Sequence, residues 1–207
     1  RMNNKRRRVV TAPGCELIDG LKKDLIFQDR LLGNDLTFHT TWGLFSPRAI
    51  DEGTRLLLEY LNVGEREIVL DIGCGYGPLG LAIGRVAKQG EIHMVDKDYL
   101  AVEYANRNAE INGLGECRAY LSNGLSEVDA SLRFDTVVSN IPAKVGRELL
   151  TILLCESHAQ MKPGGQMVVV TINGLRDFIK RNFKQVFGNY KKLKQGKAYT
   201  VARAIRE

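Results

Sequence analysis

From residue 67 onwards, short apolar runs alternate with longer stretches in which apolar residues recur at helical spacing. The short runs predict five strands, at residues 67–71, 91–96, 117–121, 134–139 and 166–172. The longer stretches predict four helices, at residues 78–88, 99–111, 145–161 and 175–187. Strands that alternate with helices in this way are typical of α/β proteins with a doubly wound, parallel sheet.

Two further strands, at residues 190–193 and 198–204, lie too close together for a helical crossover. We expect them to form an antiparallel hairpin at the sheet edge, which completes a mostly parallel sheet of seven strands. Ahead of this sheet, turn residues at 33–35 predict a small β element, and Ser46-Pro47 predicts a helix start with serine as the N-cap. The chain is therefore divided into residues 1–45, a basic tail with a small β element, and residues 46–207, an α/β domain.

The net charge of +6 is distributed unevenly along the 207 residues. Residues 1–8 carry five positive charges and no negative ones, and residues 176–207 carry a net charge of +8. The remaining residues, 9–175, therefore carry a net charge of −7. Basic ends around an acidic middle favour an anionic partner that is bound at the ends, nucleic acid first. A solvated tail and a charged helix face are the simpler interpretation of the same pattern.

The composition excludes several other classes of protein. A hydrophobic content of 44% is too high for a disordered chain, and no apolar run approaches the roughly 18 residues of a membrane span. The basic N-terminus lacks the apolar segment of a secretory signal. The four cysteines and three histidines are scattered, so we expect no metal site, and reduced thiols in a cytoplasmic protein.

A glycine-rich turn, residues 71–80, follows the first strand of the α/β unit and opens a helix. Glycines let the backbone turn sharply and approach a ligand, and the helix N-terminus adds a positive dipole end. The spacing Gly75-x-Gly77-x-x-Gly80 matches the dinucleotide fingerprint, and Asp96 follows at about the distance which that fingerprint expects. This frame predicts a nicotinamide-dependent oxidoreductase.

The competing frame begins with an acidic residue, as Asp71-x-Gly73-x-Gly75-x-Gly77. A carboxylate beside a pyrophosphate would be repelled, whereas the ammonium and sulfonium charges of S-adenosylmethionine would be attracted. Asp96, which ends the second strand, is suited in either frame to accept both hydroxyls of a ribose. Its alternative role is that of a helix cap, for which Asp98 is the better candidate.

Asparagines follow two further strands. Asn123 is suited to accept a hydrogen bond from an adenine amino group and to donate to a ring nitrogen, although asparagine is also common in turns. Ser139-Asn140-Ile141-Pro142 ends the fourth strand. The Asn140 side-chain oxygen and a neighbouring backbone carbonyl can engage both hydrogens of an exocyclic amine, which would aim the nitrogen lone pair at a methyl group.

Together, residues 71–77, Val95-Asp96 and residues 139–142 resemble the class I S-adenosylmethionine-dependent methyltransferases. Within them the chain is most similar to the small-domain group related to small-subunit rRNA guanine-N2 methyltransferases. Leu36-Thr-Phe-His-Thr40, Gly43-Leu-Phe-Ser46 and Asp51-x-Gly53-Thr54 resemble the segment that precedes the core in that group. The resemblance covers residues 25–205 and implies a Rossmann-like methyltransferase domain at 46–207.

The resemblance also implies which residues form the site. The cofactor contacts would come from the strand ends and the glycine-rich turn: Asp71, Gly73, Gly75, Gly77, Asp96, Lys97, Asn123, Gly124 and Asn140. The target amine would be held by the catalytic segment Asn140, Ile141 and Pro142. The family motif is Asn-Pro-Pro, often followed by an aromatic or aliphatic residue, whereas this chain has Ile141 in place of the first proline and then Ala143, which cannot stack on a base. Stacking on the target base would then fall to the other expected substrate-binding residues, which are Phe38, Trp42 and Phe45, with Ala143 and Lys144 beside them.

The expected function is methyl transfer from S-adenosylmethionine to an exocyclic amine of a nucleobase, with guanine N2 in rRNA as the favoured target. The basic ends would bind RNA phosphates, and the target base would leave its stack to reach the site. The altered Asn-Ile-Pro-Ala motif leaves a non-catalytic, methyltransferase-like RNA-binding factor as an alternative. A methyltransferase with a protein or small-molecule acceptor is another.

Overall fold

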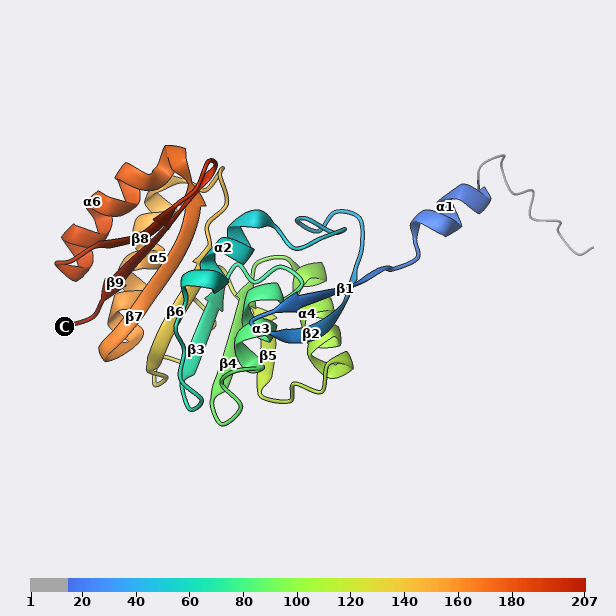
Figure 1. The fold of residues 1–207 in the computed structure, drawn as a ribbon, viewed down its shortest axis with the longest axis horizontal. Coiled ribbons are helices and arrows are strands. Elements are labelled where there is room, and N and C mark those ends of the chain that lie inside the picture. The colour runs from blue at the N-terminus through green and yellow to red at the C-terminus, as the bar shows by residue number, and fades with distance from the viewer. Residues whose placement is uncertain (1–14) are drawn as a thin grey trace, which may run out of the picture.

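The computed structural model describes residues 15–207, so the basic segment 1–8 lies outside the described residues. Its main sheet consists of β3 (Ile68–Ile72), β4 (Glu91–Asp96), β5 (Cys117–Leu121), β6 (Phe134–Asn140), β7 (Met161–Ile172), β8 (Lys191–Gln195) and β9 (Tyr199–Ile205). The strand order is β5-β4-β3-β6-β7-β9-β8, parallel from β5 to β7, with β9 antiparallel to both of its neighbours (Figure 1). The predicted seven-stranded sheet with a C-terminal hairpin is thereby confirmed.

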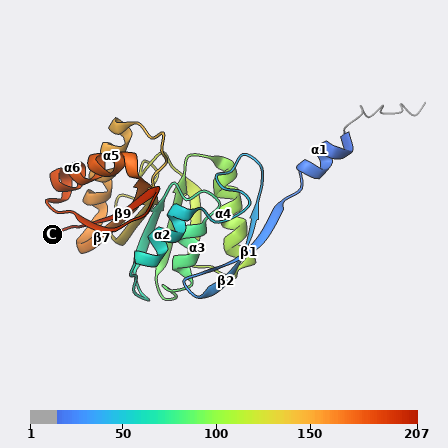
Figure 2. The same cartoon turned by 45° about the horizontal axis from the view of Figure 1, so that its top comes forward.

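Helices cover both faces of this sheet, as the alternation of strands and helices predicts. One face carries α2 (Glu52–Tyr60), α3 (Pro78–Gly84) and α4 (Tyr99–Ile111), which Figure 2 shows side by side. The other face carries α5 (Arg147–Gln160) and, after the short 3₁₀ turn η1 (Asn173–Leu175), α6 (Arg176–Phe187). Successive strand residues face opposite ways: Val69 packs with the first group of helices and Leu70 with the second.

The predicted small β element is a separate hairpin that follows the short helix α1 (Cys15–Leu21). Its strands, β1 (Leu25–Leu31) and β2 (Asn34–Thr40), are antiparallel and joined by Leu32-Gly33. Both turn residues have positive φ, 49° and 77°, the geometry of a type I′ hairpin turn. Phe38 is fully buried beneath this hairpin, where its ring packs against Phe27 and Tyr76.

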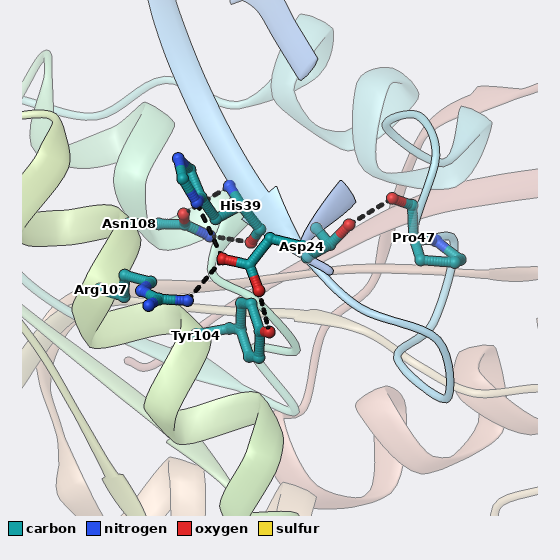
Figure 3. A network of polar contacts seen from close by, with 7 residues as sticks. Asp24, His39, Pro47, Tyr104, Arg107 and Asn108 are labelled. Atoms are coloured by element: carbon teal, nitrogen blue, oxygen red, sulfur yellow. Dashed lines mark hydrogen bonds and ion pairs between the residues drawn. The ribbon is translucent and has the colours of Figure 1, made fainter. Parts of the chain in front are cut away.

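A polar network holds the hairpin against α4 (Figure 3). Asp24 accepts hydrogen bonds from the Tyr104 hydroxyl at 2.6 Å and from Arg107 at 2.6 Å, and its carboxylate lies 3.0 Å from His39 Nδ1. Partial burial opposes ionisation, but the hydrogen bonds from Tyr104 and His39, with the Arg107 charge, hold the pKa of Asp24 below its usual value. The side chain of Asn108 bonds the backbone of His39 beside this network.

Three predicted boundaries are wrong by four residues or more. The helix expected at Ser46 begins at Glu52, because Asp51 accepts hydrogen bonds from the backbone amides of Gly53 and Thr54 and so caps it. Ser46 instead has φ 47° and lies in a turn. The strand predicted at residues 166–172 begins at Met161, because residues 162–165 are an irregular part of β7 opposite Asp135, where the pairing shifts register. The helix predicted at residues 78–88 ends at Gly84.

Candidate functional site

The carboxyl ends of the parallel strands form one wall of a cavity of about 590 Å³. It lies where β3 and β6 are neighbours and their connections leave in opposite directions, the point at which open α/β sheets bind ligands. The start of α2 and the glycine-rich turn close its sides. A volume of this size accommodates a nucleoside-sized molecule with a second group beside it.

The glycine-rich turn presents its backbone to this cavity. Gly73 and Gly75 have φ of 71° and 55°, and a Cβ built on either would meet nothing within 4 Å. Gly77, a third predicted contact, lies off the cavity wall: with φ 94° it is the N-cap of α3, and Pro78 occupies the first helical position. Gly80 has a different role: a Cβ there would lie 2.5 Å from the Met94 sulfur, so glycine allows α3 to pack closely on the sheet.

Asp71 lies beneath the turn and off the cavity wall, although we predicted it as a direct contact. It is fully buried, and its Oδ2 accepts a hydrogen bond from the Gly80 amide at 3.0 Å. Oδ1 has no hydrogen-bond partner in the described part of the chain. Burial, with a smaller contribution from the Asp96 charge, raises the pKa of Asp71 to about 7, although the Gly80 bond opposes the rise.

Asp96, in contrast, lines the cavity at the end of β4. Its Oδ2 accepts from the Gly75 amide at 2.9 Å and its Oδ1 from the Asp98 amide at 3.0 Å. Each carboxylate oxygen keeps capacity for a further hydrogen bond, so two ligand hydroxyls can still be accepted. Asp98 caps α4 through a bond from the Leu100 amide, as the sequence predicts.

The loop after β5 supplies the next part of the wall. Asn123 is exposed and lines the cavity with its neighbour Gly124 and with Lys97 from the loop after β4. Gly124 has φ 64°, and a Cβ there would lie 2.4 Å from Leu153, so the turn depends on glycine. The structure thus places these three predicted cofactor residues around one space.

Asn140 ends β6 on the cavity wall, opposite the glycine-rich turn across the β3–β6 boundary. Its side-chain nitrogen donates to Asp51 Oδ2 at 2.9 Å and to Thr54 Oγ1 at 3.0 Å, so its side-chain oxygen is the end left for a ligand. Ile141 is buried, and its amide extends the pairing with β7 by bonding the Val170 carbonyl. Pro142, in contrast, is exposed on the cavity rim.

The predicted substrate-binding residues separate into two groups. Phe45, 66% exposed, lines the cavity together with Ala143 and Lys144. Trp42 is 40% exposed but lies off the cavity wall, with the Arg48 guanidinium 4.7 Å from its ring centroid. The prediction for Phe38 is wrong, since its ring is fully buried in the core under the hairpin and cannot stack on a base.

Sequence reasoning missed three cavity residues that form a polar group of their own, Asp51, Thr54 and Tyr199. Asp51 and Thr54 belong to a segment that resembles the family. Because we predicted the helix to start at Ser46, we did not recognise Asp51 as its N-cap or expect its side chain at the cavity. Tyr199 opens β9, and its hydroxyl donates to Asp51 Oδ1 at 3.2 Å. No local signal marks it, because it reaches the site only through the antiparallel hairpin at the sheet edge.

Two further features bear on the kind of site. Within residues 15–207, no helix has the length and apolar character needed to cross a bilayer. The same range holds no cluster of three or more histidine, cysteine, aspartate or glutamate side chains that could bind a metal ion.

Comparison with known proteins identifies one relative of uncharacterized function and one that is named as an rRNA methyltransferase. An uncharacterized protein of Bacillus subtilis (strain 168), YbxB, is 37% identical over 142 residues, which are 68% of this chain and 71% of the relative. The ribosomal RNA small subunit methyltransferase C of Shewanella loihica is 33% identical over 181 residues, 84% of this chain and 51% of the relative. The chain thus spans about half the length of that methyltransferase.

A solved structure shares the fold over most of the chain. The T. thermophilus 16S rRNA N2 G1207 methyltransferase (RsmC), in complex with AdoMet and guanosine, superposes with a TM-score of 0.81 at 30% identity. The match covers 89% of this chain and 51% of that one. The family model described as methyltransferase small domain matches residues 35–203, which include every cavity residue named above. The chain belongs to the methyltransferase small domain family.

Proposed function

We propose that this protein transfers a methyl group from S-adenosylmethionine to the exocyclic amine of a guanine, N2, in ribosomal RNA. The observation that carries the proposal is the side chain of Asn140, whose amide donors are both engaged by Asp51 and Thr54. Its oxygen therefore remains to accept a hydrogen bond from an amine in the cavity. The choice of ribosomal RNA guanine as the target is supported by the similarity to proteins that are named as rRNA methyltransferases.

The residues present fit the cofactor. Gly73 and Gly75 leave open space at the backbone, and the carboxylate of Asp96 can accept the hydroxyls of a ribose. The Oδ1 of buried Asp71, unpartnered within residues 15–207, places an acidic group behind the turn, which favours a ligand with positive charge. When bound, S-adenosylmethionine supplies a methyl group on a sulfonium that leaves as a neutral thioether.

The segment 140–142 then acts on the target amine. The Asn140 oxygen and a neighbouring backbone carbonyl accept one amine hydrogen each, which turns the nitrogen lone pair towards the cofactor side of the cavity. Phe45 stands exposed on the cavity wall and is the ring we assign to stacking on the flipped base. No strong general base is needed, since the proton can leave after the methyl group is bound to nitrogen.

The expected RNA contacts are basic. Lys144 lines the cavity, and Lys194 and Lys197 are exposed around the β8–β9 turn next to Tyr199. Residues 1–8 would add five positive charges, and the resulting affinity should fall steeply with salt. We place this activity in the cytoplasm, where ribosomal RNA is matured in bacteria.

The test is incubation of the protein with labelled S-adenosylmethionine and ribosomal subunits from a strain that lacks the gene. We expect label in one guanine of the small-subunit RNA, identified by nuclease mapping as N2-methylguanine. RNA binding without methyl transfer would favour the non-catalytic RNA-binding factor. Binding of NAD, with no binding of S-adenosylmethionine, would favour the oxidoreductase instead.

Asn140→Ala separates chemistry from cofactor binding. We expect methyl transfer to fall by about 100-fold or more, because the amine loses the acceptor that orients it. The dissociation constant for S-adenosylmethionine, measured by calorimetry, should change less than about threefold. Full activity in this variant would refute the role that we assign to Asn140.

A further inference from the structure

The orientation of the Asn140 side-chain amide decides whether it can serve the proposed reaction. One end of the amide is an acceptor and the other carries two donors, and a rotation by 180° about the last bond exchanges them. A target amine needs the acceptor. A cavity that presented the donors instead would repel it.

Asp51 favours one orientation over the other. In the observed orientation the Asn140 nitrogen donates to Asp51 Oδ2 at 2.9 Å and to Thr54 Oγ1 at 3.0 Å. In the reversed orientation the Asn140 oxygen would face the carboxylate of Asp51, which has no proton to donate. The reversal would exchange a charge-assisted hydrogen bond for a repulsion between two acceptors.

Asp51 is itself held in place from three sides. Its Oδ2 accepts from the backbone amides of Gly53 at 2.8 Å and Thr54 at 3.2 Å, and its Oδ1 accepts from the Tyr199 hydroxyl. The N-terminus of α2 stabilises its negative charge. At Gly53 a Cβ would lie 2.8 Å from Asp51 Oδ2 and 3.1 Å from the Tyr199 ring, so glycine permits this arrangement.

We propose that Asp51 is a positioning residue that fixes the side-chain amide of Asn140 with its oxygen towards the target amine. Thr54 and Tyr199 assist it, Thr54 by binding the second amide hydrogen and Tyr199 by fixing the carboxylate. This proposal rests on the proposed function for its consequence in catalysis. The orientation of the Asn140 amide is independent of the proposed function and can be measured separately.

Two substitutions of Asp51 separate positioning from helix capping, because serine and asparagine both cap helices well. In Asp51→Ser the shorter side chain still reaches the α2 amides but not Asn140. We expect kcat to fall by about tenfold or more, with the KM for S-adenosylmethionine within about threefold of the wild-type value. In Asp51→Asn the cap bonds hold the side-chain oxygen in the place of Oδ2, so we expect rescue to at least about a third of the wild-type kcat.

A measurement without substrate tests the orientation alone. The side-chain amide resonances of Asn140 are identified by NMR through their loss in Asn140→Asp. We expect slow hydrogen exchange of these two protons in the wild type and in Asp51→Asn, and fast exchange in Asp51→Ser. If Asp51→Ser proves unfolded, the isosteric Thr54→Val should still speed the exchange of one proton and lower kcat by about threefold.

The outcomes distinguish the two proposals. Unchanged exchange and kcat in Asp51→Ser would overturn the positioning role and leave the methyltransferase function intact. A wild-type protein that transfers no methyl group to RNA would overturn the proposed function. The exchange measurement would then still decide whether Asp51 orients Asn140.

Discussion

Asp71 is a carboxyl group without access to solvent, whose Oδ1 has no partner among the described residues. Burial raises its pKa in the folded protein to about 7, against 3.8 for an ordinary aspartate. Between these two values the folded protein holds a proton that the unfolded chain has lost. The free energy of unfolding should therefore fall as pH rises from about 4 to about 7, and this contribution should level off above about pH 7.

Asp71→Asn tests this relation. The variant removes the titration, so the difference in unfolding free energy between variant and wild type should shift in favour of the variant as pH rises from about 5 to about 7. Chemical denaturation at a series of pH values across this range measures it. Asp98→Asn, which replaces an exposed helix cap by an equivalent one, is the matched control and should show no such trend. A difference for Asp71→Asn that does not vary with pH would contradict the raised pKa.

For single residues, the sequence predicted most of those that line the cavity, but not which side chains are buried. Asp96, Asn123 and Asn140 line the cavity as expected, because a residue that ends a parallel strand lies at the same sheet edge whatever the packing. Phe38 and Asp71 are buried instead. Burial depends on which distant residues cover a position, and residues close in the sequence do not report it.

Helix α4 and its C-cap carry three asparagines whose side-chain amides hydrogen-bond to the backbone of a strand, as a neighbouring strand would. The amides of Asn108 and Asn112 each bond both the N–H and the C=O of one β2 residue, His39 and Thr37, at 2.7 to 2.9 Å. Asn106 binds Ala119 on the edge strand β5 in the same way. Asparagine is a poor helix former, so its repetition in a helix points to such a role. The helix thus covers strand edges that would otherwise be open.

Asn108 has an additional bond, to the carbonyl of Tyr76 in the glycine-rich turn, at 3.0 Å. Asn108→Ala should lower the free energy of unfolding by about 2–4 kcal/mol, because it leaves several backbone groups unpaired in a buried place. It should also weaken S-adenosylmethionine binding by about threefold or more through the loosened turn. Denaturant unfolding and calorimetry measure the two effects.

Asn106→Ala is the matched control for that prediction, since it lies on the same helix and removes the same kind of paired backbone bonds. It should be destabilising, but by less, since Asn106 is exposed, and cofactor affinity should stay near the wild-type value. Equal effects of the two variants on cofactor affinity would show that the hairpin is not coupled to the turn through Asn108.

The boundaries of α4 were predicted correctly, because Asp98 and Asn112 flank it as its caps. The start of α2 was predicted poorly, because two signals competed. Ser46-Pro47 and Asp51 are both plausible helix starts, and the start at Asp51 has, besides its local cap bonds, contacts with Asn140 and Tyr199, 89 and 148 residues away. Local sequence does not contain those contacts.

At the scale of the molecule, the sequence predicted a mostly parallel sheet with an antiparallel C-terminal hairpin, because helical crossovers join parallel strands and a short turn joins antiparallel ones. The strand order comes from the structure. The cavity at the β3–β6 boundary follows from that order. What the order does not give is the role of the C-terminal hairpin in the site. Its antiparallel turn returns the chain to the carboxyl edge of the sheet, so that Tyr199 joins a cavity built mainly from residues 45–153.

The distribution of positive charge around that edge leads to a prediction about RNA binding. Three lysines stand at the cavity or at the hairpin turn beside it: Lys144, Lys194 and Lys197. Three exposed basic residues lie at the opposite edge of the sheet, just before the N-termini of β3, β4 and β6: Arg66, Lys88 and Arg133. If RNA enters the cavity with its target base, only the first set can approach phosphates.

Replacement of all three lysines of the first set by glutamine should weaken RNA binding and flatten its salt dependence. The slope of log affinity against log salt concentration should become shallower by about 0.7 for each phosphate of single-stranded RNA that the protein no longer neutralises. The second set, changed to glutamine, removes the same total charge and should leave the slope unchanged. Filter binding at several salt concentrations distinguishes them. Equal changes for both sets would mean that net charge, and not the edge of the sheet at which it stands, governs binding, and the cavity face would lose its assignment as the RNA-binding surface.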